Sequence, residues 1–373
     1  MGRAIALSAS LLDEAGTEPG SFIVPELPWQ VRVNPDQAVL VALADASREI
    51  GRLEGADRTA GQVIQGRYAL ASIEAWCCVL ATDAKVSWGE VDRAFVGPKK
   101  WWEQPWTDAE LAAGLIEYHL GLRPYGSHQR VTEGVPNELD TGEVVSPHFR
   151  AEFEFGIAEW LADGSGSGLI KAAMAMMSMA ASMPHSRHVA MAARAAFPRM
   201  LTHARGSDVF VPISFGFLGF SSEWDSVARA LASPDGYDDS TLNRALELVL
   251  RAVERAAFAS SFQIEGHQYV RRQKIPPALR VWFAESRPLV RNILYTLHAL
   301  PSASRPQLEE LTGYPTRSVN RAVRSLAERD LVRIDGTVRG DAVYVVRAKP
   351  RWTPWPKIAR LYPSVSAAWE GQR

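Results

Sequence analysis

The sequence predicts a mostly α-helical protein that ends in a smaller α+β module of helices and strands. Apolar residues recur at helical spacing over most of residues 36–275. Alternation of apolar and polar residues, which is typical of strands, is found mainly in residues 331–346. Of the 373 residues, 47% are apolar and 22% are charged. This composition excludes a wholly disordered chain, and the length suggests two or three domains.

Residues 1–35 are expected to form an extended arm, because they combine four prolines with little periodicity. Pro35 and Asp36 then open the first helix of the body. A second helix is predicted over residues 60–81. The apolar positions of the first helix are Val39, Leu40, Leu43 and Ile50.

The rest of the body is also predicted to be mainly helical. Thr107 and Glu110 have the spacing of a capping box, which marks the start of a helix that ends near residue 120. Residues 163–168, Asp-Gly-Ser-Gly-Ser-Gly, separate two helices and form either a flexible connection or a lid. Residues 208–220 are the only strand-like run in the body. Other helices are predicted over 150–162, 169–182, 222–232 and 240–273, with an alanine-rich helix that follows Pro184 and ends near Phe197.

The C-terminal module has a distinctive order of elements. A helix begins at Pro288 and is stopped by Pro301, and a short helix over residues 307–311 follows. A Gly-Tyr-Pro turn leads to Thr316, which is expected to cap a third helix over residues 317–329. Two alternating runs around a glycine-containing turn then predict a β-hairpin. Helix, helix, turn, helix and hairpin is the order of a winged helix-turn-helix.

The third helix of this module has two unlike faces. Val319, Ala322, Val323 and Leu326 follow the i, i+3, i+4, i+7 spacing of a buried face, and polar residues occupy the opposite face. Residues 313–351 contain nine basic and four acidic residues, although the whole chain has a net charge of −1. A local basic surface of this kind is suited to phosphate, and arginine and asparagine are suited to base edges. The predicted DNA-binding residues are Thr316, Arg317, Asn320, Arg321, Arg324, Ser325 and, in the wing, Arg339.

Other interpretations of this module stay open. A winged helix can instead bind another protein, and an arginine-rich face can be merely solvated. Glu328 lies on the same predicted face and weakens the attraction to a polyanion. The arginine spacing favours DNA.

Segments of the predicted helical body resemble a known protein family. Residues 36–56 (DQAVLVALADASREIGRLEGA) resemble the N-terminal Fic helix, which often ends in Arg-Leu-[Asp/Glu]-Gly, and residues 67–75 (RYALASIEA) resemble the next helix. The sequence VPIS at 211–214 also follows the order of the Fic core. The similarity runs loosely over most of residues 36–347 and implies a Fic-like helical body, and Fic proteins frequently end in a winged helix. The chain is also similar to proteobacterial proteins of unknown function that are common on rhizobial replicons.

The resemblance fails at the Fic catalytic motif, H-P-F-x-[DE]-G-N-G-R-x-x-R. Laid on this chain without gaps, the motif puts Met183 in place of the general base and Arg187 in place of the metal-binding acid. Methionine cannot accept a proton, and an arginine would repel Mg²⁺. We therefore expect a pseudoenzyme without nucleotidyl transfer and without a cofactor. A remnant anion pocket is a further expectation, with candidate residues His185, Arg187 and Arg194.

Several other classes of site are disfavoured. His185 and His188 share one helix face but lack further metal ligands nearby, so no metal site is expected. Cys77 and Cys78 are adjacent, which is a poor geometry for a disulfide and favours a reduced, cytoplasmic location. The most apolar stretch, residues 169–182, is shorter than the roughly 20 residues of a membrane span.

Together these observations favour a cytoplasmic DNA-binding protein, a transcriptional regulator that acts as a homodimer. The body serves dimerisation or the sensing of a ligand or protein partner. One alternative is a divergent Fic-type nucleotidyl transferase, and another is an interaction protein of the antitoxin or scaffold type. The predicted domains are the arm (1–35), the helical body (36–275), the winged helix-turn-helix (276–350) and a Pro/Trp-rich tail (351–373).

Overall fold

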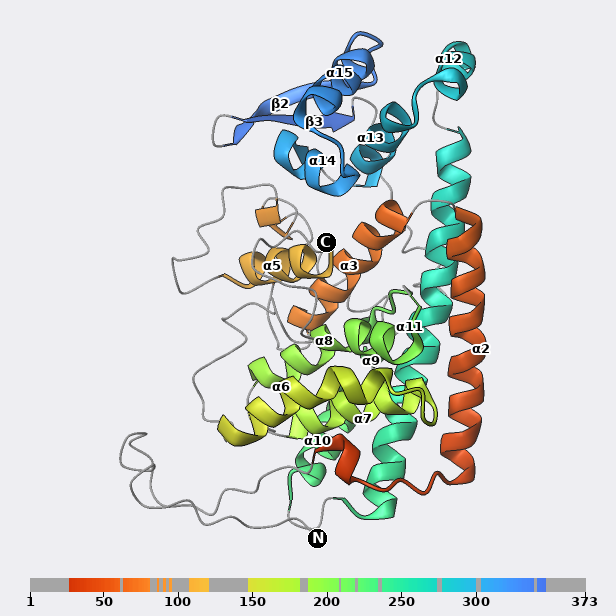
Figure 1. Ribbon diagram of the computed structural model, residues 1–373, viewed down its shortest axis with the longest axis vertical. Coiled ribbons are helices and arrows are strands. Elements are labelled where there is room, and N and C mark those ends of the chain that lie inside the picture. Colours follow the sequence, from red (N-terminus) through yellow and green to blue (C-terminus); the bar gives the residue numbers. More distant parts are fainter. Residues whose placement is uncertain are drawn as a thin grey trace, which may run out of the picture. The chain divides into compact units, whose positions relative to one another are not determined.

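The computed structural model of the chain confirms that the protein is mostly helical (Figure 1). Two long helices, α2 (Gln37–Ala60) and α11 (Asp239–Gln273), each contribute to two compact units. One unit comprises Met1–Ile50 and Tyr125–Ala256, and the other comprises Gly51–Pro124 and Ala257–Arg373. The structure describes residues 27–60, 63–80, 86, 90–91, 94–95, 107–120, 147–181, 187–207, 209–218, 221–233, 237–273, 277–299, 303–338 and 341–346.

The first unit is built around the apolar helix α7 (Gly168–Ala181), which packs against α6, α8 and α10. Met174, Met176 and Met177 are buried in it. Gly168 lies so close to the carbonyl of Ala204 that a Cβ there would overlap it. The other helices of this unit are α6 (Pro147–Ala162), α8 (Arg187–Arg205), α9 (Ile213–Phe217) and α10 (Ser221–Leu231), preceded by the short 3-10 helix η1 (Pro28–Gln30).

The described end of the predicted arm packs on this unit. Leu27 and Pro28 are buried, and the ring of Trp29 covers Gly156 of α6, where a larger residue would meet the indole. The chain then runs extended to α2. The residues just before α2 are hydrogen-bonded to α11. Asp36 N–H donates to Asn243 Oδ1 (3.1 Å), and Asn243 Nδ2 donates to the Asn34 carbonyl (3.0 Å).

Two elements of the first unit differ from the sequence prediction. Helix α8 does not end near Phe197 but continues through Pro198 to Arg205. Proline removes one backbone donor, but Ala196, Phe197, Met200 and Leu201 are buried, and this packing keeps the helix continuous. The strand expected within residues 208–220 is wrong, because Ile213–Phe217 form the short helix α9. There Gly216 lies against the carbonyl of Ala252, which favours a residue without a Cβ.

The second unit contains two mutually packed helices, α3 (Val63–Leu80) and α5 (Asp108–Leu120). The predicted capping box is confirmed at the start of α5, where Thr107 N–H donates to Glu110 Oε2 (2.8 Å). Cys77 and Cys78 are buried in α3 and form no disulfide. Helix α13 packs on α3. The remaining elements are η3 (Pro277–Leu279), α12 (Arg280–Glu285), α13 (Pro288–Ala299), β1 (Ala303–Ser304), α14 (Arg305–Thr312), α15 (Thr316–Ala327), β2 (Val332–Val338) and β3 (Asp341–Val346).

The last three helices of the second unit pack on a small antiparallel sheet with strand order β1-β3-β2 (Figure 1). The predicted hairpin is confirmed, since β2 pairs with β3 from Val332 opposite Val346 to Val338 opposite Asp341, with an irregularity between Ile334 and Thr337. Strand β1 was not predicted. It has two residues, so it carries no readable alternation, and it forms only because β3 offers a free edge.

No helix in the described part of the chain is both long and apolar enough to cross a membrane. The described residues also contain no cluster of three or more histidine, cysteine, aspartate or glutamate side chains arranged to hold a metal ion.

Candidate nucleic-acid interface

Helix α15 is presented by the helix and turn that precede it. Helix α14 ends at Gly313, whose left-handed backbone (φ 68°) turns the chain sharply. Tyr314 follows and is exposed, and Pro315 is extended and precedes the first residue of α15. Thr316 was predicted to cap this helix. That prediction is wrong by one position, because Pro315 is the N-cap and Thr316 is the first helical residue.

The buried face of α15 is the one predicted. Val319, Ala322, Val323 and Leu326 are all buried, and α15 packs against α13, α14 and β2. Because these four positions lie on one side of the helix, the residues between them must face away from the module. The orientation of the whole helix is therefore set by its apolar spacing.

Opposite this buried face, α15 presents a row of arginines. Arg317, Arg321 and Arg324 are exposed, and Asn320 is half-buried beside them. Within the part of the chain that the structure describes, none of the three guanidinium groups forms an ion pair. At 100° per residue the three side chains fall within about 60° of one another around the helix axis. This arginine row is a cationic edge about two turns long.

The C-terminal end of α15 is held by Arg329. Its guanidinium lies over the ring of Trp282 on α12, 4.1 Å from the ring centroid. Arg329 Nη1 also donates to the Ser325 carbonyl (3.0 Å) and to Ser325 Oγ (3.3 Å). The Ser325 hydroxyl, predicted as a DNA contact, therefore already accepts a hydrogen bond from Arg329. Glu328 is mostly exposed and lies 3.9 Å from Arg329.

In the described part of the chain, the β2–β3 hairpin adds few exposed side chains to those of α15. Arg333 and Ile334 on β2 are exposed. Arg339, the predicted wing contact, lies outside the described residues. The sequence prediction did not single out Ile334 or Tyr314, because an exposed apolar side chain has no signature in a sequence.

The predicted anion pocket is only partly described. His185 and Met183 lie outside the described residues, and Arg187 is the first residue of α8. Arg194 is 2% exposed, so its guanidinium lies in the core of the first unit rather than on a surface. Further along α8, burial and the nearby Arg199 lower the pKa of His203.

The loop before α7 is held by hydrogen bonds rather than open. Lys171 is 7% exposed and bonds to Asp163 and to the Trp160 carbonyl (2.9 Å). Ser165 N–H and Oγ both donate to Asp163 Oδ1 at 2.7 Å. Gly164 and Gly166 have positive φ, which glycine adopts without strain. Residues 163–168 were predicted to form either a flexible connection or a lid, and these hydrogen bonds favour neither role, because they tie the segment to α7.

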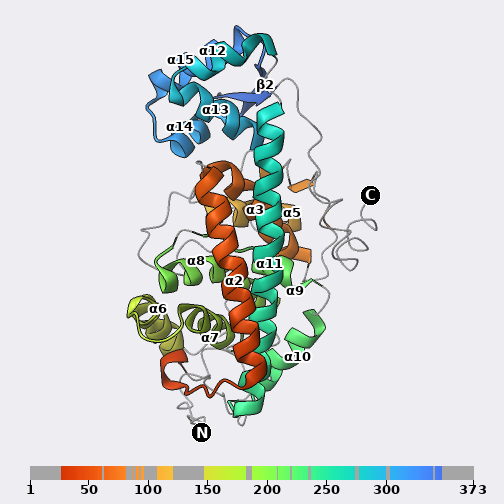
Figure 2. The same ribbon diagram turned by 90° about the vertical axis from the view of Figure 1, so that its right-hand side faces the viewer.

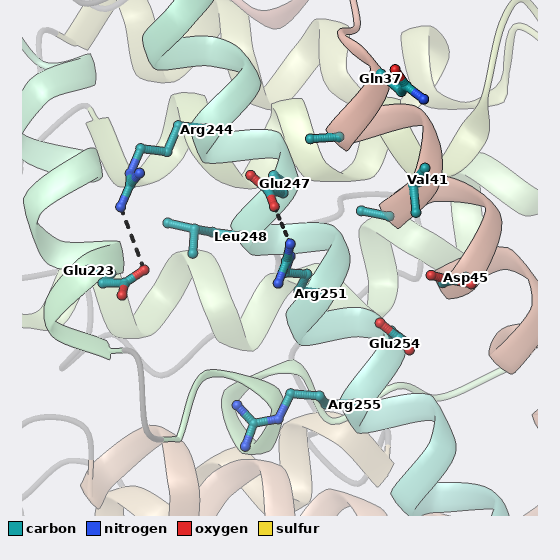
Figure 3. Close-up of a pocket in the computed structure, with 12 residues that line it drawn as sticks. Gln37, Val41, Asp45, Glu223, Arg244, Glu247, Leu248, Arg251, Glu254 and Arg255 are labelled. Atoms are coloured by element: carbon teal, nitrogen blue, oxygen red, sulfur yellow. Dashed lines mark ion pairs between the residues drawn. The ribbon is translucent and has the colours of Figure 1, made fainter.

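The sequence alone did not indicate a groove in the first unit, between the first half of α2, α10 and the first half of α11 (Figure 3). Its volume is about 970 Å³. The groove could not be predicted because it depends on how three distant segments pack. It is lined by Gln37, Ala38, Val41, Ala42, Asp45, Glu223, Arg244, Glu247, Leu248, Arg251, Glu254 and Arg255.

Comparisons with known proteins assign no family. No protein-family profile matches the chain, and no curated protein matches it. One similar solved structure is that of a Fic family protein from Desulfovibrio desulfuricans G20, at 9% sequence identity. The superposition has a TM-score of 0.44 and covers 86% of this chain and 99% of that chain. A superposition this loose does not establish a common fold, so the Fic-like body stays a prediction from the sequence.

Proposed function

We propose that residues 288–346 form a winged helix-turn-helix and that the protein binds double-stranded DNA through α15, as a transcriptional regulator. The observation that supports this proposal is the arginine row of Arg317, Arg321 and Arg324, which is exposed opposite a fully buried apolar face. The order of helices and strands around it, with the sheet order β1-β3-β2, is the one that such modules have.

In this proposal α15 enters the major groove, which is wide enough to admit a helix. The arginine fork can donate two hydrogen bonds to guanine O6 and N7, and Asn320 can pair with adenine in the same way. Arginines that face the groove walls neutralise phosphates instead, and each such contact makes binding weaker at higher salt. Thr316, at the start of the helix, lies beside the same face.

The proposal is tested by replacing Arg321 and Arg324 together with alanine in the full chain. Affinity for a duplex DNA is measured by fluorescence anisotropy between about 50 and 200 mM salt. We expect at least about tenfold weaker binding, because each lost base or phosphate contact contributes of the order of 1 kcal/mol or more. The slope of log K against log[salt] should fall by about 0.9 for each phosphate contact that is lost.

A matched control replaces Arg32 and Arg229, which are also exposed but belong to the first unit. This variant loses the same formal charge and should keep both the affinity and the salt slope. Binding that is equal in both double variants would reject the assignment of α15.

We propose in addition that the body does not transfer nucleotides. The support is in the sequence, where Met183 and Arg187 stand at the positions of the catalytic base and the metal-binding acid of the Fic motif. The chain is incubated with labelled nucleoside triphosphate and magnesium. Label on the chain or on an added protein would favour the divergent transferase instead.

A further inference from the structure

Helix α2 carries an exposed apolar pair, one member of which lines the groove of the first unit. In the described part of this unit, the large apolar side chains that stay exposed are Leu40 (52%) and Val41 (55%), which are consecutive residues of α2. Val41 lines the groove, and Leu248 faces it from α11 (Figure 3). Covering Val41 with another molecule would remove this apolar surface from water, which favours association.

Helices α2 and α11 run in the same direction along this groove, so residues of the two helices can be matched by their level. Asp36 bonds to Asn243 where both helices begin. Further along, the charge of Asp45 acts on Glu254 and, after burial, is the next largest cause that raises its pKa. Figures 1 and 2 both show the first half of α2 beside the first half of α11. Val41 and Ala42 therefore lie near the level of Leu248 and Val249.

The exposed side of α11 carries charges that alternate in sign. Arg244, Glu247, Arg251 and Glu254 follow one another on one face of the helix and all line the groove. If a second α11 ran parallel and in register, like charges would be opposite one another. If it ran antiparallel about a point at residue 249, Arg244 would face Glu254 and Glu247 would face Arg251, because both pairs are equally distant from that point.

From this arrangement we infer that the α2–α11 groove is the self-association surface of the protein, and that its occupant is a second copy of this chain. The twofold axis lies outside the chain and runs across the groove face of both helices, at the level of Ala42 and Val249. The two copies of α11 then run antiparallel, and Val41 of each copy lies close to the axis. A twofold interface needs one surface that is complementary to itself, and the charge row has this property.

The pairs that exist within one chain do not oppose this association. Arg251 bonds to Glu247 at 2.5 Å and Arg244 lies 3.8 Å from Glu223, and both arginines are largely exposed. Exposed pairs of this kind contribute little to stability. Sharing these groups with a second copy therefore costs little. Glu254, on which Asp45 and Glu49 as well as Arg48 and Arg251 of its own chain act, would face one more opposite charge.

The inference goes beyond DNA binding and is tested without DNA. The molar mass of the full chain is measured by light scattering and analytical ultracentrifugation over a concentration series. We expect a dimer, and Val41→Glu should weaken it at least about tenfold because it places two like charges at the axis. Val281→Glu is the matched control, since Val281 is 68% exposed on α12, and it should leave the dimer unchanged.

A charge exchange tests the register independently of Val41. Arg244→Glu and Glu254→Arg should each weaken the dimer, and the double variant should restore it. These two residues are ten positions apart, or about 15 Å along one helix, so restoration requires a contact between two copies. A wild-type chain that is monomeric throughout, a dimer insensitive to Val41→Glu, or a double variant without restoration would each overturn the inference. Circular dichroism checks that every variant is folded.

Discussion

Lys171 places a positive charge in the apolar helix α7, and the carboxylate of Asp163 compensates this charge. The bond from Lys171, followed by those from Ser165, lowers the pKa of Asp163 to about 2. An unfolded aspartate titrates near pH 3.9. Because the folded pKa is the lower one, the interaction stabilises the folded state above about pH 4 and is lost as the pH falls towards 2.

Asp163→Asn should therefore lower stability in a pH-dependent way. We expect a lower urea midpoint than that of the wild type at pH 6, and a difference that shrinks between about pH 4 and about pH 2. Asp225→Asn is a suitable control, because Asp225 is exposed on α10. A difference that stays constant with pH would contradict the assigned role of the Asp163 carboxylate.

Two glycines should respond in opposite ways to replacement by alanine. A Cβ at Gly216 would overlap the Ala252 carbonyl, so Gly216→Ala should cost about 1–3 kcal/mol. At Gly51 in α2 no atom lies within 4 Å of the place that a methyl group would take, so Gly51→Ala should gain about 0.4–1 kcal/mol. Chemical denaturation measures both changes. Equal effects would show that the packing around Gly216 tolerates a side chain.

At the scale of the element, the apolar face of α15 holds the helix in the module, and its arginine row faces away from the module. Leu326 is fully buried, so Leu326→Ala should destabilise the second unit by about 2–5 kcal/mol. Arg321 is exposed, and Arg321→Ala should change stability by no more than about 0.5 kcal/mol. Denaturation followed in parallel with DNA binding distinguishes the two. Destabilisation by Arg321→Ala of similar size would mean that the arginine row has a structural role.

The elements that were predictable from sequence are those whose cause is local. The buried face of α15 follows from the spacing of Val319, Ala322, Val323 and Leu326, and the start of α5 follows from Thr107 and Glu110. Elements that depend on packing partners distant in the chain were not predicted correctly. Strand β1 needs the edge of β3, and α8 passes Pro198 because its flanking residues are buried.

The same division applies to the candidate sites. The arginine row lies on one helix, so its exposure could be predicted from that helix alone. Of the predicted anion-pocket residues, His185 lies outside the described residues, and Arg194 on α8 proved to be buried. The groove joins α2, α10 and α11, which no local pattern connects. The alternation of charges along α11 could be read from the sequence. That these charges line the same groove as Val41 of α2 could not.

At the scale of the whole molecule, the two proposals assign DNA binding to the second unit and self-association to the first. The second unit carries the arginine row, and the first carries the α2–α11 groove. A dimer would supply two α15 helices to one duplex, so DNA sites with twofold symmetry are expected. Either proposal can fail without the other, because the molar mass is measured without DNA.

The most direct test of DNA recognition by α15 uses a single reactive cysteine. The natural cysteines, Cys77 and Cys78, are buried, so Thr316→Cys can be labelled selectively with an iron chelate that cleaves nearby DNA. Duplexes selected by the protein from a random pool serve as the substrate, and Ser222→Cys on α10 serves as the control. If α15 lies in the major groove, the Thr316→Cys label should make discrete cuts and the control label none. Cleavage no stronger than that of the free chelate, or equal from both positions, would contradict recognition through α15.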